Sequence, residues 1–173
     1  MRKLRMPIKI GTLARFLECC GYSATLRFHS KWEFITEMIS VISLTNMVSQ
    51  ELAPGQSLIF STPVMHSGKC ECFRPNSGAV ILRAQNAIYE VHFSANIGAT
   101  APGEAQLSIE VNGSPIFEGT MMSTTVAAGD LNNVSRCIPI RTCCGGSVTI
   151  TIVNTGETTI TVENPSLFVK RDA

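Results

Sequence analysis

Thiols are the side chains most able to do chemistry in this chain of 173 residues, which holds seven cysteines. Cys70-Glu71-Cys72 would place two thiols on one face of a strand, and Cys143-Cys144 adjoins a Gly-Gly turn. Four thiolates could bind zinc tetrahedrally, but neither spacing is the CxxC knuckle that usually wraps this metal. We therefore favour free or buried thiols, with a disulfide formed in an oxidising medium second and zinc third. The other cysteines are Cys19, Cys20 and Cys137.

Groups suited to acid–base or nucleophilic catalysis are few and scattered. The three histidines fall apart from one another: His29 near the N-terminus, His66 in an expected loop and His92 in an alternating strand. Asp130 is the only aspartate before the last two residues, which argues against paired-aspartate chemistry. The chain has no Gly-rich phosphate loop, no GxSxG and no HExxH motif. We therefore predict that the protein is not an enzyme and has no catalytic, cofactor-binding or metal-binding residue.

The elements that position these groups begin with a short helical pattern. Ser30 and Glu33 fit a capping box, in which the two side chains satisfy backbone amides at a helix start. Apolar residues then recur with helical spacing, namely Trp32, Ile35, Met38, Ile39 and Ile42. We predict a helix over about residues 31–45, within a basic leader of residues 1–46. The pattern is too short for a convincing coiled coil, so we expect this helix to pack on the body of the protein.

From Met47 to the C-terminus the pattern changes to alternation with period two. Val148, Ile150 and Ile152 would face one way, and the residues between them would face the other. We expect strands over residues 57–64, 70–73, 79–83, 87–96, 105–112, 115–126, 134–141, 147–154, 158–163 and 166–171. Their regular spacing, without helical patterns between them, predicts an all-β, antiparallel, two-sheet jelly-roll sandwich over residues 47–173, with a short helical leader.

Turn residues set the expected connections. Asn112-Gly113 is the strongest hairpin signal in the chain. Asn154-Thr155-Gly156 and Asn164-Pro165 are also expected to reverse the chain, because Gly and Asn tolerate positive φ and Pro interrupts a ladder. The tail is therefore predicted to be a hairpin followed by a closing strand over 166–171. This last strand should be central, since its apolar run Leu167-Phe168-Val169 would aggregate at an exposed edge.

Charge divides the chain into a basic leader and a mildly acidic body. Residues 1–31 hold seven Lys or Arg and one acid, while residues 32–173 hold seven against twelve acids, giving net charges of +6 and −5. Charge alone could draw the leader to nucleic acid, but no aromatic interleaving supports this, and we expect no nucleic-acid partner. No stretch reaches the ~18–20 apolar residues of a membrane span. Lys9, Arg15 and Glu18 interrupt any signal-peptide core, so we expect synthesis in the cytoplasm without a cleaved signal.

The low charge of the whole chain indicates that part of its outer surface is covered by other subunits. Only 16% of the residues are charged, while 45% are hydrophobic. A monomer normally limits its exposed apolar area, so we expect other subunits to cover part of the sandwich.

The segment from Ala87 to Arg171 resembles the C-terminal domains of collagen-like, exosporium and phage-associated proteins of Gram-positive bacteria. These domains are similar to the trimeric jelly rolls of the tumour necrosis factor and complement globular-head superfamily. The resemblance covers roughly residues 52–171 and is carried by Leu107 to Thr120 with its Val-Asn-Gly turn, Ala127 to Asn133, Cys143-Cys144 and Val153 to Arg171. It implies a homotrimer on a spore surface, exosporium or virion that acts by assembly and attachment. No Gly-X-Y run precedes the segment, so the resemblance lacks a collagen stalk.

Two other functions use similar scaffolds. A carbohydrate-binding module would bind a surface glycan and usually presents exposed aromatics. Here the body offers Tyr89 and phenylalanines that are expected to alternate inward, which weakens this alternative. A cupin-type enzyme would need histidines gathered around a metal, and the scattered histidines argue against it. A host receptor is the remaining expected kind of partner.

Overall fold

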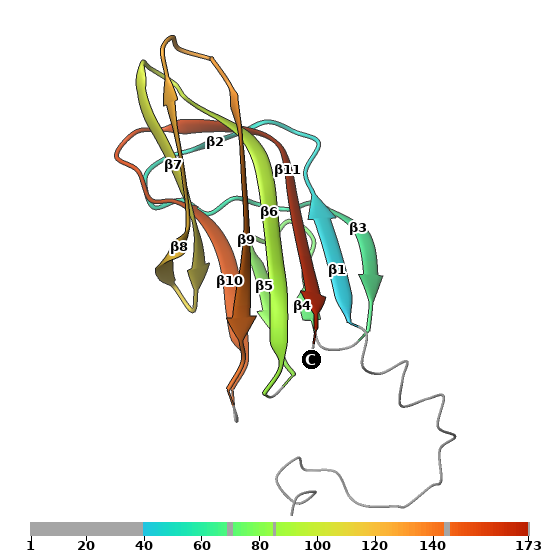
Figure 1. Ribbon diagram of the computed structural model, residues 1–173. Helices are drawn as coiled ribbons and strands as arrows, with labels where there is room; N and C mark the ends of the chain where they lie inside the picture. Colours follow the sequence, from blue (N-terminus) through green and yellow to red (C-terminus); the bar gives the residue numbers. More distant parts are fainter. Residues whose placement is uncertain (1–39, 69–70, 85, 144–145, 173) are drawn as a thin grey trace, which may run out of the picture. The chain divides into compact units, whose positions relative to one another are not determined.

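The computed structural model describes residues 40–68, 71–84, 86–143 and 146–172 (Figure 1). The predicted all-β, antiparallel two-sheet sandwich is confirmed over these residues. Its strands are β1 (Val41–Thr45), β2 (Gln50–Leu52), β3 (Thr62–Ser67), β4 (Glu71–Phe73), β5 (Ala79–Leu82), β6 (Ile88–Ala99), β7 (Gly103–Val111), β8 (Ser114–Thr125), β9 (Asn132–Arg141), β10 (Val148–Asn154) and β11 (Ile160–Arg171). No helix in this part of the chain is long and apolar enough to cross a membrane.

Strands that are far apart in the sequence lie side by side in each of the two sheets. One sheet has the order β3-β1-β11-β6-β9, with β2 beside β11, and the other has the order β4-β5-β10-β7-β8. Alternating positions on both sheets point into one core, whose largest fully buried side chains include Tyr89, Phe60 and Phe93. The core is built mainly from Ile, Leu and Val, because branched residues at every second position fill the space between two pleated surfaces.

The last strand is central, as predicted. β11 pairs with β1 and β2 on one side and with β6 on the other, and Figure 1 shows it between β1 and β6. Leu167 and Val169 are at most 1% exposed. The predicted reversal at Asn164-Pro165 is wrong, because these residues form an irregularity within β11 between Glu163 and Ser166. A bulge of this kind accommodates a proline, which has no amide hydrogen for the ladder.

The predicted helix is wrong over its last five residues. Residues 41–45 form strand β1, which pairs with both β11 and β3. Ile42 and Leu44 are fully buried while their neighbours are half-buried, so period two overrides the helical spacing here. Residues 31–39 of the expected helix lie outside the described residues. The six-stranded sheet thus includes residues on the N-terminal side of Met47, where we expected the sandwich to start.

The two strongest turn signals have different outcomes. Asn112-Gly113 joins β7 to β8 in a tight hairpin, with positive φ of 52° and 78°, as predicted. The predicted hairpin at Asn154 to Gly156 is wrong, because β10 lies in the five-stranded sheet and β11 in the six-stranded sheet. This segment instead carries the chain across from one sheet to the other.

Buried Asn154 holds that crossover. Its Nδ2 donates to the carbonyl oxygens of Leu52 and Thr158, both at 2.8 Å, and its Oδ1 accepts from the Gly156 amide at 3.0 Å. The side chain is 0% exposed, so these bonds satisfy an amide that burial would otherwise penalise. One side chain therefore links the end of β2, the end of β10 and the segment before β11.

Candidate functional site

The outward side of the six-stranded sheet carries two uncharged rows across its strands. In the first row Ser43 lies opposite Met65 and Phe168, and His92 lies opposite Phe168 and Cys137. The second row is Thr62, Thr45, Ser166, Ser94 and Ser135. None of these side chains is an acid, a lysine or an arginine. We call the two rows the uncharged face.

Phe168 lies at the centre of the uncharged face. It points outward between the buried side chains of Leu167 and Val169, and it is half-buried in the isolated chain. Ser43 and His92 lie opposite it, and the neighbouring row of the face is made of hydroxyl side chains. Charge returns in the row on the other side, where Lys170 lies opposite Glu90. Interface cores in proteins combine aromatic anchors with a depletion of charge, which is the composition seen here.

Cys137 at the border of the uncharged face is not set up for nucleophilic chemistry. Its Sγ donates to Oε1 of Glu90 at 3.2 Å. Burial and this carboxylate raise the pKa of the Cys137 thiol, so the reactive thiolate is disfavoured at neutral pH. His92 lies opposite Cys137 in the ladder. Among the described residues, no group of three or more His, Cys, Asp or Glu is placed to hold a metal ion.

The remaining sequence candidates are not brought together in the described residues. Cys72 is half-buried on β4 and Cys143 is exposed after β9, and both are free. Cys19, Cys20, Cys70, Cys144 and His29 lie outside the described residues, so the preference for free thiols over zinc stays a prediction. His66, which we expected in a loop, lies exposed in edge strand β3.

A second apolar surface lies where β8 and β9 meet at the edge of the sandwich. Phe117 is 94% exposed and Met122 is 57% exposed. They line a shallow groove of about 540 Å³ together with Glu118, Thr120, Arg136, Cys137, Ile138 and Pro139. The groove is continuous with the uncharged face, because Cys137 belongs to both. Phe117 and Phe168 thus contradict the expectation that the phenylalanines alternate inward.

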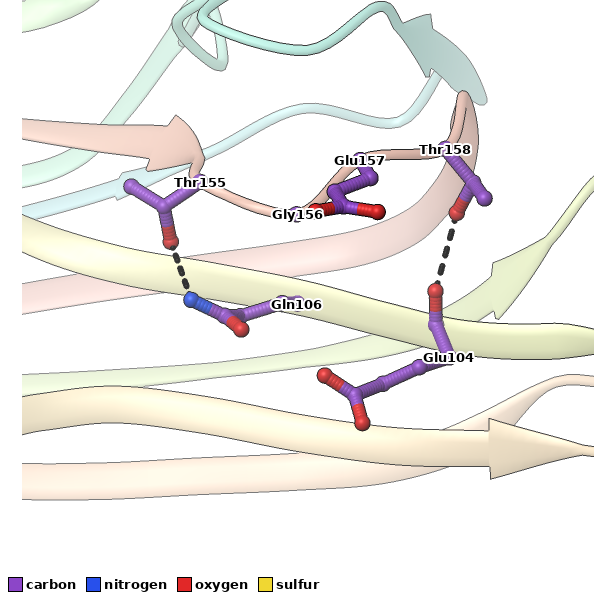
Figure 2. Close-up of a pocket in the computed structure, with 6 residues that line it drawn as sticks. All are labelled: Glu104, Gln106, Thr155, Gly156, Glu157 and Thr158. Carbon is purple, nitrogen blue, oxygen red and sulfur yellow. Dashed lines mark hydrogen bonds between the residues drawn. The ribbon is translucent and has the colours of Figure 1, made fainter.

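A polar pocket of about 420 Å³ lies between β7 and the crossover from β10 to β11 (Figure 2). Gln106 Nε2 donates to Thr155 Oγ1 at 2.8 Å, and Thr158 Oγ1 donates to the Glu104 carbonyl oxygen at 2.9 Å. The Thr155 hydroxyl also bonds Ser108 Oγ at 2.7 Å. These polar groups are already engaged with one another, and no aromatic side chain lines the pocket. These hydrogen bonds therefore tie the crossover to β7.

Comparisons with known proteins support the fold. No protein-family model and no curated protein matches the chain. The globular domain of zebrafish complement 1qA protein aligns with a TM-score of 0.52 and 11% identity over 77% of this chain and 95% of that one. Murine APRIL at pH 5.0 aligns with a TM-score of 0.52 and 13% identity, over 78% and 99%. Eiger TNF from S. frugiperda aligns with a TM-score of 0.55 and 6% identity, over 79% and 92%.

At these identities the likeness shows the fold alone. The described residues have the jelly roll of the tumour necrosis factor and complement globular-head domains. The jelly-roll fold that the sequence resemblance implies is thereby confirmed.

Proposed function

We propose that the protein is a non-catalytic structural domain that assembles as a homotrimer through its uncharged face. The single observation that carries this proposal is the half-buried Phe168, which stands among ten ladder positions without an acid, lysine or arginine. In an isolated subunit, the aromatic ring of Phe168 would stay partly exposed to water in the middle of the six-stranded sheet. Contact with a second copy would remove that aromatic ring from water.

The β8–β9 groove of one subunit could contact the uncharged face of a neighbouring subunit. The uncharged face and the β8–β9 groove adjoin at Cys137, but Phe168 is central to the first and Phe117 lines the second. When one surface of a subunit binds a different surface of its neighbour, the contact repeats, and it closes into a ring if the rotation between neighbours is a whole fraction of a turn. A ring of three is the assembly implied by the sequence resemblance. We infer that the groove edge of one subunit packs on the uncharged face of the next.

The setting of this trimer follows from the resemblance to collagen-like, exosporium and phage-associated domains. We propose display on a bacterial spore surface or a virion, with attachment to a surface glycan or a host receptor. Among the described residues, the one thiol that lies beside a carboxylate and a histidine, Cys137, has a raised pKa, and this supports a role in assembly and attachment.

The test is the mass of the full chain in solution, measured by light scattering at micromolar concentration. We expect three times the chain mass of 18.7 kDa. Phe168→Glu should yield folded monomers, because it would bury a carboxylate in each of three contacts. Ile81→Glu is the matched control, since Ile81 is half-buried on the outward side of the five-stranded sheet and should leave the mass unchanged. A monodisperse wild-type monomer would refute the assembly.

A carbohydrate-binding module is the second candidate, and one observation favours it. Phe117 stands exposed above a groove that also presents Glu118 and Arg136, and an exposed aromatic beside polar groups can stack on a sugar ring. The same side chain is needed by the assembly proposal, so replacing it distinguishes the two functions.

A further inference from the structure

A third surface hollow lies on the outward side of β4 and β5, in the five-stranded sheet. It has a volume of about 360 Å³ and is lined by Cys72, Phe73, Arg74, Ser77, Ala79, Ile81 and Arg83. Cys72 lies directly opposite Ile81 and forms the middle of the floor. We call this hollow the arginine groove. Neither the uncharged face nor the β8–β9 groove shares a residue with it.

The two arginines stand at opposite ends of the arginine groove. Phe73 lies opposite Val80, so the next residue, Arg74, adjoins Ala79. Arg83 follows Ala79 by four residues, which corresponds to about 13 Å along an extended strand. The floor between them is a thiol and apolar side chains. Two cations therefore border one strip of apolar surface.

Neither guanidinium has an acidic partner among the described residues. This is notable in a body whose residues 32–173 carry a net charge of −5. Two cations at the ends of one apolar strip give it a positive potential, which attracts anionic groups. The planar guanidinium forms paired hydrogen bonds with carboxylate, sulfate or phosphate groups.

We propose that the arginine groove binds an acidic oligosaccharide, with one anionic group on each arginine and a sugar ring against the floor formed by Cys72, Ala79 and Ile81. The size of the hollow falls in the range of small-ligand sites, about 300–1,000 Å³. A protein partner would need a contact of about 800 Å² on each side, which a hollow of this size does not offer. The site deepens the attachment role of the proposed function, but it lies on the other sheet and does not depend on trimer formation.

The first test is calorimetric titration of the full chain with three tetrasaccharides of equal length. A hyaluronan tetrasaccharide supplies carboxylates, a heparin-derived tetrasaccharide supplies sulfates, and cellotetraose is the neutral control. We expect one or both acidic probes to bind and cellotetraose not to bind. Arg74→Gln and Arg83→Gln should each weaken binding about tenfold, the loss expected for one charge-assisted contact. Absence of binding by both acidic probes would overturn the proposal.

Arg141→Gln provides the matched control. Arg141 is an exposed arginine at the end of β9 that lines a different hollow, and its replacement changes the net charge by the same amount. We expect it to change the affinity less than twofold. An equal loss with Arg141→Gln would mean that the protein attracts anions by its overall charge, which contradicts a specific groove.

Residues 1–31 form a basic leader with seven Lys or Arg, which could also bind an acidic saccharide. The reactivity of a single cysteine distinguishes binding in the arginine groove from binding to this leader. Cys72 lies on the groove floor, so saturating ligand should slow its alkylation severalfold, as followed by peptide mass spectrometry. Cys143, exposed outside the arginine groove, should react at an unchanged rate. Binding that leaves Cys72 unprotected would refute the site.

Two further measurements distinguish a failure of the trimer proposal from a failure of the ligand assignment. Light scattering on the same samples reports assembly, so a chain that stays monomeric but protects Cys72 would refute only the trimer. A tetra-glutamate peptide that binds as tightly, and loses affinity in both arginine variants, would replace the saccharide by an acidic peptide and overturn the ligand assignment.

Discussion

The outward sides of the two sheets differ sharply although their inward sides are alike. On the six-stranded sheet the central strands present Ser94, Ser166 and Phe168, in rows without a formal charge. On the five-stranded sheet charge stands on either side of β10, with Glu110 on β7 and Arg83 just past β5. Both inward sides are filled by Ile, Leu and Val. A shared core sets the fold, whereas the outward residues give the two sheets surfaces suited to different partners.

The crossover from β10 to β11 joins the two sheets, and Asn154 is the residue whose replacement tests how firmly it joins them. Asn154→Ala removes the bonds to the Leu52 and Thr158 carbonyls and leaves the Gly156 amide without its acceptor. We expect the free energy of unfolding to fall by about 2–4 kcal/mol, the largest effect predicted here. Chemical denaturation at constant pH measures it.

Asn133→Ala is the control for that experiment. Asn133 is exposed, and its Nδ2 donates to the Ala95 carbonyl and the Asn96 side chain at the surface. Loss of these solvent-accessible bonds should cost no more than about 0.5 kcal/mol. Equal losses in the two variants would show that the crossover is not held by Asn154.

The segment around Asn154 could not be predicted from local sequence. Asn112-Gly113 and Asn154-Thr155-Gly156 look alike as turn signals, yet one closes a hairpin and the other joins two sheets. Local backbone preference fixes the first turn, because both central residues need positive φ. The second depends on the Leu52 carbonyl, which lies 102 residues away in sequence. No local pattern contains that partner.

Strand content and the central place of β11 could be predicted because alternation and an apolar run are local properties. The uncharged face could not, since it exists only when β1, β11, β6 and β9 lie side by side. Phe117 was misjudged for a related reason. Its strand was expected, but five of the first six residues of β8 are not buried against the core, so alternation does not assign an inward side there. The edge position of the strand decides the exposure.

Replacing Phe117 tests what covers the uncharged face. If the β8–β9 groove of a neighbour packs there, Phe117→Ser should weaken assembly by about 1–2 kcal/mol, or roughly tenfold in the dissociation constant. Val126→Ser is the control, because Val126 is also highly exposed, at 88%, but lies in the loop after β8. Sedimentation over a dilution series measures both. Unchanged assembly with loss of binding to a glycan array would favour the carbohydrate-binding module instead.

The smallest expected effect concerns β4, a strand whose two sides separate opposite charges. Arg74 and Cys72 line the arginine groove outside, while Glu71 is 2% exposed on the inward side. The Ser40 hydroxyl donates to Glu71 Oε2, and Oε1 has no hydrogen-bond partner among the described residues. Burial raises the pKa of the Glu71 carboxyl above its ordinary value, although the Ser40 bond opposes the shift. The folded protein therefore takes up this proton at a higher pH than the unfolded chain does.

Because the folded state holds the proton more tightly, stability falls as pH rises from the unfolded-state pKa, about 4.3, to the raised folded-state pKa, and is then level. Glu71→Gln imitates the protonated acid, so it should remove this decline and raise stability at neutral pH by about 1 kcal/mol, or roughly 3 °C in melting temperature. At pH values below both pKa values, the variant should match the wild type. Glu118→Gln, on the exposed part of β8, is the matched control and should leave both the melting temperature and its pH profile unchanged. A lower melting temperature for Glu71→Gln at pH 8 would mean that the ionised carboxylate stabilises the fold through a contact that an amide cannot make.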